Sequence, residues 1–123
     1  MAAPNIVNIT ALYGRIAYAA PTNTSATVLL SNAASSGLLY RVNTLVATNV
    51  TTTPAVTTVS INNAAAGGGT AYRIAYQIVV PAYASLVIID KNGAQNIAEN
   101  TSIVVTSGTA SAIEYVVSYD EIS

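Results

Sequence analysis

The stretch from residue 71 to residue 80, AYRIAYQIVV, carries an apolar side chain at every second position. At about 100° per residue, these side chains would be spread around an α-helix, whereas an extended strand places them on one face. We therefore expect a strand with Tyr72, Ile74, Tyr76 and Ile78 aligned. Pro81 has no backbone donor, so it should mark a bend before a second strand that is apolar on both faces.

Similar β-branched and aromatic runs recur along the chain, with turn signals about every ten residues. The other expected strands cover residues 5–18, 26–31, 39–50, 55–62, 102–107 and 112–119. Gly14 is expected to form a bulge or kink, and Asn92-Gly93 is the strongest short turn signal. No window predicts a capped helix, and no linker divides the chain. The sequence predicts one domain over 1–123, an all-β antiparallel sandwich, jelly-roll-like, of about seven to nine strands.

Few residues of the chain are charged, and this limits the classes of partner that it can bind. Charged residues make up 7 % of the chain and the net charge is −1, against roughly 25 % charged residues in an average soluble domain. The four cations are scattered, so no basic patch predicts nucleic-acid binding. No apolar run approaches the roughly 20 residues of a spanning helix, so we expect no membrane partner. The first ten residues also lack the basic and apolar regions of an export signal.

The residues that most often carry chemistry are missing. The chain has no histidine and no cysteine, which removes the usual zinc ligands and the common nucleophile–base pairs. Of the five carboxylates, Asp120 and Glu121 are adjacent and should point to opposite faces of a strand. The loop DKNGAQNIAEN (90–100) offers oxygen atoms but not the calcium-loop spacing of an EF-hand. We therefore predict no catalytic residue, no metal site, no cofactor and no enzymatic activity.

Tyrosine and arginine remain as candidates for recognition. Eight tyrosines are present and neither tryptophan nor phenylalanine, so tyrosine must supply all aromatic bulk. Core and interface packing is favoured over a sugar-binding platform, which usually contains tryptophan. Arg41 and Arg73 lie within strand runs. Each is either an outward-facing side chain whose stem covers its neighbours or part of an intersubunit ion pair, and both interpretations stay open.

Four phrases, taken in order, are characteristic: MAAPNIVNIT, LLSNAASSGLLYRVNTLVATNV, GGTAYRIAYQIVVPAYASLVIIDKN and IEYVVSYDEIS. Together they resemble a family of small virion structural proteins of tailed phages, especially those infecting cyanobacteria. The resemblance implies a role on the particle, as a capsid decoration (cement) protein or a small tail or fibre component. It implies the major capsid protein as the main partner, a location on the capsid surface or the tail, and no catalytic residues.

A weakly charged, apolar surface suits a subunit that is covered by its neighbours. We expect a small ring, a homotrimer, held on a repeating lattice by many weak contacts. The candidate interface residues are Ile6, Val7, Ile9, Leu12, Arg41, Tyr72, Arg73 and Tyr76. Residues 1–12 are either an arm that adds a strand to a neighbour or the first strand of the chain's own sandwich. The alternative functions are a tail, fibre or baseplate component and a carbohydrate-binding adhesin domain.

Overall fold

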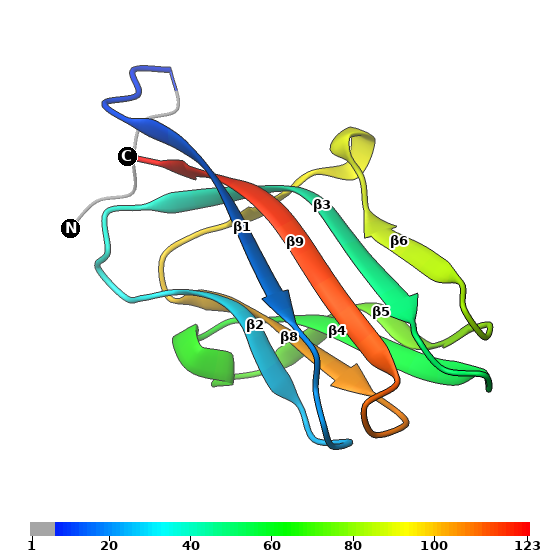
Figure 1. Cartoon of the computed structure of the whole chain (residues 1–123). Helices are drawn as coiled ribbons and strands as arrows, with labels where there is room; N and C mark the ends of the chain where they lie inside the picture. The colour runs from blue at the N-terminus through cyan, green and yellow to red at the C-terminus, as the bar shows by residue number, and fades with distance from the viewer. Residues whose placement is uncertain (1–6) are drawn as a thin grey trace.

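The computed structural model describes residues 7–123, which form nine strands and two short 3₁₀ turns (Figure 1). The elements are β1 (Leu12–Ala19), β2 (Thr27–Asn32), β3 (Leu39–Asn49), β4 (Ala55–Asn62), η1 (Ala65–Gly67), β5 (Ala71–Val80), β6 (Ser85–Ile89), η2 (Lys91–Gly93), β7 (Gln95–Ile97), β8 (Thr101–Ser107) and β9 (Ile113–Ile122). One sheet, here called sheet A, has the order β1-β9-β3-β6, with β7 also paired to β3. The other, sheet B, has the order β2-β8-β4-β5.

The pairing is that of one long hairpin rolled into two layers. Strands β4 and β5 form the innermost pair, β3 and β6 pair outside them, and the outer pairs are β2 with β8 and β1 with β9. All of these pairs are antiparallel. With the three-residue β7 set aside, this strand order is that of a jelly roll, so the predicted all-β sandwich is confirmed.

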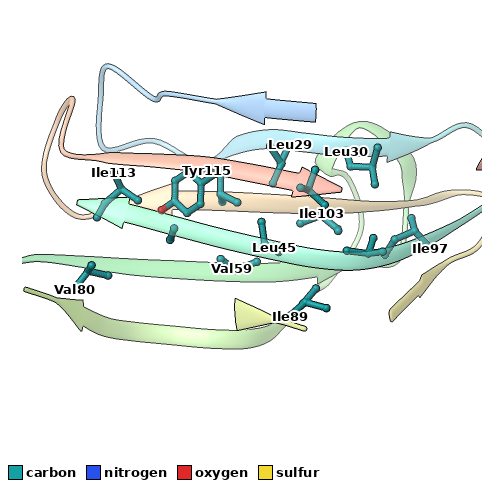
Figure 2. Close-up of a cluster of buried hydrophobic side chains, with 14 of the residues drawn as sticks. Leu29, Leu30, Leu45, Val59, Val80, Ile89, Ile97, Ile103, Ile113 and Tyr115 are labelled. Carbon is teal, nitrogen blue, oxygen red and sulfur yellow. The ribbon is translucent and has the colours of Figure 1, made fainter. Parts of the chain in front are cut away.

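The core lies between the two sheets and is almost entirely aliphatic (Figure 2). Along β9, Ile113, Tyr115 and Val117 are buried while Glu114 and Val116 are exposed, which is the period-two alternation of a strand with one covered face. Tyr115 is the only fully buried tyrosine of the described chain, and Tyr40 and Tyr119 are half-buried. The remaining tyrosines are exposed: Tyr13, Tyr18, Tyr72, Tyr76 and Tyr83. Tyrosine therefore contributes far more to the surface than to the core.

Tyr115 also ties the two sheets together by hydrogen bonding. Its hydroxyl contacts the hydroxyl of Thr57 on β4 and donates to the carbonyl oxygen of Thr106 on β8 at 3.0 Å. Thr57 is completely buried. Burial raises the pKa of Tyr115 above its usual value of 10, while the hydrogen bond with Thr57 acts in the opposite direction.

Buried asparagines fix the loops between strands. The Asn49 side-chain amide donates to the carbonyl oxygens of Thr53 at 2.8 Å and Val80 at 3.0 Å, and its oxygen accepts from the Thr51 amide. Asn32 likewise donates to carbonyl oxygens of a neighbouring loop and of β7. These side chains are buried because they satisfy backbone groups that the turns leave unpaired.

Several expected boundaries differ from the structure. The first strand begins at Leu12 rather than at residue 5, and β7 was not predicted. Gly14 forms no bulge, because the β1–β9 register runs through it without a shift. The bend at Pro81 is confirmed, since β5 ends at Val80.

Two turns join strands that do not pair with each other. Asn92-Gly93 does form a turn, capped by Asp90, whose carboxylate accepts from the Gly93 amide at 3.0 Å. However, the strands on either side of it, β6 and β7, both pair with β3 and not with each other. Likewise β8 and β9 lie in opposite sheets, so the turn at residues 108–112 crosses between layers. Local turn chemistry gives the reversal of the chain but not the sheet to which the next strand belongs.

Candidate interaction surface

The exposed apolar side chains lie mainly along two opposite sides of the sandwich. Strands β1 and β2 are the edge strands on one side, and β5 and β6 are edge strands on the other (Figure 1). We call the first side the β1 edge; its exposed large apolar residues are Leu12, Tyr13, Ile16, Tyr18, Val28 and the adjacent Val116. We call the second the β5–β6 edge; its exposed large apolar residues are Tyr72, Ile74, Tyr76, Ile78, Val79, Tyr83 and Val87. The central strands β3, β4 and β8 contribute none.

Part of the β1 edge lies on the outer face of sheet A, where Glu114 and Val116 of β9 are exposed. Tyr18 is 76 % exposed and lies opposite Val116 in the β1–β9 register. Val116 in turn lies opposite Val46, and Val46 lies opposite Val87. Directly opposite residues in antiparallel strands point to the same side. An apolar row therefore crosses the outer face of sheet A and joins the two edges.

A hollow lies at the end of this row on the β1 edge. It has a volume of about 280 Å³ and is lined by Tyr18, Ala19, Ala20, Glu114, Tyr115 and Val116. Glu114 is the only charged residue of the lining and is exposed. The volume lies just below the roughly 300–1,000 Å³ of typical small-molecule sites. A hollow of this volume is large enough to take a protein side chain.

The β5–β6 edge is shaped by irregularity in β5. The β4–β5 register shifts twice, between Thr57 and Val59 and between Val59 and Ser60. Gln77, in the same region, has a φ of 49°, a left-handed conformation that is uncommon for residues other than glycine. Such bulges re-aim side chains and interrupt regular pairing at a sheet edge.

The bulges overturn the expected alignment of tyrosines on β5. Ala75, which strict alternation would place on the opposite face from Ile74 and Ile78, lines one hollow of about 190 Å³ with them, between β5 and β6. The Arg73 guanidinium carbon lies 5.4 Å from the centroid of the Tyr76 ring, so these two side chains share a face. Strict alternation would have separated them.

The structure separates the predicted interface residues into several groups. Tyr72, Arg73 and Tyr76 lie together on β5, and all three are exposed. Leu12 begins β1 on the opposite side of the sandwich, preceded by Val7 and Ile9, which are also exposed.

The remaining two predicted residues fall elsewhere. Arg41 is half-buried on β3, opposite Asp120 and Asn96 in the register. Ile6 lies outside the described residues. Sequence reasoning missed Ile16, Tyr18 and Val116. The sequence offers no signal that separates these apolar strand residues from core residues, because only the strand order shows which strands lie at an edge.

The end of the expected arm belongs to the chain's own fold. The amides of Thr10 and Ala11 donate to the Ser123 carbonyl oxygen at 2.7 and 3.0 Å, and the Ser123 amide donates back to Ala11 at 2.9 Å. Residues 10–12 are therefore held against the C-terminal end of β9. An arm that reaches a neighbour would have to consist of residues before Thr10, of which 1–6 lie outside the described part.

An aromatic and charged cluster closes the core near this end of β9. Arg15 forms a salt bridge with Glu121 at 3.3 Å, and its guanidinium carbon lies 5.4 Å from the Tyr13 ring centroid. Tyr40 and Tyr119 have ring centroids 5.0 Å apart. Their pKa values are raised, first by burial and then by the negative charge of Glu121. Tyr40 and Tyr119 pack against the buried core residues.

Four of the five carboxylates each have their own hydrogen-bond partner. No group of three or more potential metal-ligating residues occurs within residues 7–123. Glu99 accepts from the Gly37 amide at 3.2 Å, and Asp90 caps η2, so the acidic ends of the loop considered for calcium have separate structural partners. Asp120 and Glu121 do point apart: Asn43 donates to Asp120, whereas Glu121 binds Arg15.

Comparisons with known proteins add no family assignment. No family model matches the chain, and no curated protein matches it. In the described part of the chain, no helix is long and apolar enough to cross a membrane.

Proposed function

We propose that this chain is a non-enzymatic virion structural protein, a capsid decoration (cement) protein that stabilises a phage shell by binding the major capsid protein. The observation that carries the proposal is the concentration of exposed apolar side chains along two edges of a rigid sandwich. Large contiguous apolar patches on a protein surface mark contacts with other macromolecules. Such a surface would be a solubility liability for a free monomer with 7 % charged residues.

The fold agrees with this role by analogy. Jelly rolls occur in viral capsid proteins and also in lectins and cupins, so the architecture alone selects none of these functions. The resemblance of the four sequence phrases to small virion proteins of tailed phages favours a role in a viral particle over the other functions of this fold. Attachment would be mainly apolar and hydrogen-bonded, because few charges are present to contribute. A homotrimeric ring on a repeating lattice would gain avidity from many such contacts.

A carbohydrate-binding adhesin is the second candidate, and the exposed Arg73–Tyr76 pair on β5 is the feature that favours it. Aromatic rings and a guanidinium can stack on and hydrogen-bond a sugar. Glycan-array binding by the purified chain, abolished by Tyr76→Ala, would support this function in place of the structural one.

The decisive experiment counts and locates the chain in purified particles of the virus that encodes it. Quantitative peptide mass spectrometry gives the copy number, and cryo-electron microscopy gives the neighbours. Hundreds of copies on the shell are expected for a decoration protein. A few copies at the tail would instead identify a tail, fibre or baseplate component, and absence from the particle would refute a virion role.

A further inference from the structure

We propose that copies of this chain associate head to tail, with the β5–β6 edge of one copy seated on the β1 edge of the next. In this contact Arg73 and Tyr76 face the hollow that is lined by Tyr18 and Glu114. The inference rests on the proposed structural role, because it names the second copy as one of the partners that cover the apolar surface. It is carried by four features: the positions, areas and charges of the edges, and the backbone of β5.

The positions of the edges favour a ring. The β1 edge and the β5–β6 edge lie on opposite sides of the sandwich (Figure 1). A contact between two different surfaces of the same subunit is heterologous, and its repetition closes into a ring when the rotation allows. One contact type then covers both apolar edges of every copy.

The apolar area of the β5–β6 edge is comparable with the area that one partner contributes to a stable interface. On the β5–β6 edge, Tyr72, Tyr76 and Tyr83 are 61, 58 and 71 % exposed, and each tyrosine can bury about 150–250 Å². With the exposed aliphatic side chains of the same edge, the apolar area reaches several hundred Å². A standard interface uses about 800 Å² per partner. The edge can therefore supply most of a stable contact.

The charges of the two edges are opposite. The only salt bridge within residues 7–123 joins Arg15 on β1 to Glu121 on β9, so the one charged side chain of β1 is paired. Glu114 remains as the free charge at the hollow of the β1 edge. Arg73 remains as the free charge on β5 of the opposite edge. Head-to-tail association brings these unlike charges to the same interface, whereas pairing of two β5–β6 edges would bring two arginines together.

The backbone of β5 also argues against pairing of like edges. Its two register shifts and the left-handed Gln77 interrupt the regular row of donors and acceptors that a second β5 strand would need. The β5–β6 edge therefore offers side chains to a partner rather than a continuous strand. Tyr76, exposed on the β5–β6 edge, and the hollow beside Tyr18 and Glu114 on the β1 edge would then act as an anchor residue and its pocket.

Complementary blocking variants test the proposal. Tyr18→Asp blocks the β1 edge, and Tyr76→Asp blocks the β5–β6 edge; both side chains are largely exposed, so the fold should persist. Thr109→Asp, in the exposed β8–β9 loop, is the matched control. Sedimentation velocity and native mass spectrometry over a concentration series report the species, and far-UV circular dichroism checks folding.

Head-to-tail association predicts that the wild type and Thr109→Asp form the same oligomer and that each blocking variant alone is monomeric. An equimolar mixture of the two blocking variants should form a one-to-one heterodimer, because each supplies the edge that the other lacks. A homodimer of either variant would overturn the proposal in favour of like-edge pairing. A wild type that stays monomeric yet binds the particle would overturn the proposal while leaving the proposed virion role intact.

Discussion

The hydrogen bonds of Tyr115 give the sharpest quantitative prediction about the fold. Tyr115→Phe removes the contact with Thr57 and the bond to the Thr106 carbonyl oxygen. Each lost bond costs about 0.5–1.5 kcal/mol net, and a buried group left without a partner costs about 1–3 kcal/mol. Because Thr57 is completely buried, we expect Tyr115→Phe to lower the free energy of unfolding by about 2–4 kcal/mol.

Thr57→Val should cost less, about 1 kcal/mol, because Tyr115 can still donate to Thr106. The double variant has no Thr57 hydroxyl that could be left without a partner. Its loss of unfolding free energy should therefore be smaller than the sum of the two single losses by about 1–2 kcal/mol. Urea unfolding followed by far-UV circular dichroism measures the unfolding free energy of the two single variants and the double variant. All measurements use one protein concentration, because association adds apparent stability. Thr52→Val, in the exposed β3–β4 loop outside both apolar edges, is the control and should change stability by less than about 0.5 kcal/mol. Additive losses, or a neutral Tyr115→Phe, would refute the reasoning.

Three further predictions follow from local geometry and charge. Because the pKa of Tyr115 is raised in the fold, the protein should lose stability as pH rises above 10 and through that higher pKa, and Tyr115→Phe should lose less over this range in pH-dependent melting. Gly108→Ala places a Cβ 2.2 Å from a Val56 methyl and should cost about 1–3 kcal/mol, whereas Gly14→Ala meets nothing within 4 Å and should not destabilise; thermal melting compares them. Binding to the particle should persist at molar salt in a co-sedimentation assay, since release by salt alone would show that charges dominate the attachment.

The sequence predicted the class of fold because period-two alternation is a local property. The strand Ala55–Asn62 was expected with its exact bounds, and the break at Pro81 follows from a missing backbone donor. The layer to which each strand belongs is not local. The turn at Asn92-Gly93 looks like a hairpin, yet β3 pairs with the strands on both sides of it.

The candidate surface was predictable only in part, for a physical reason. Tyr72 and Tyr76 were expected at an interface because tyrosine supplies all the aromatic bulk of the chain, and Arg73 because arginine is favoured there. All three do lie exposed on an edge strand. Their arrangement depends on bulges in β5. The strand contains no glycine or proline, so the sequence does not indicate these bulges. The β1 edge was missed because an apolar residue such as Ile16 on a strand reads equally well as core. Only the strand order shows that β1 has a neighbour on one side alone.

Reactivity of the tyrosines in the intact particle tests the central claim most directly. Hydroxyl-radical footprinting with mass spectrometry compares the free chain with the assembled one. Tyr18, Tyr72, Tyr76 and Tyr83 are exposed in the single chain, and Tyr115 is buried and serves as the internal reference. If the two apolar edges are the binding surfaces, Tyr18, Tyr72 and Tyr76 become protected on assembly while Tyr115 stays unreactive in both states. Unchanged reactivity of these three tyrosines in the particle would contradict the claim.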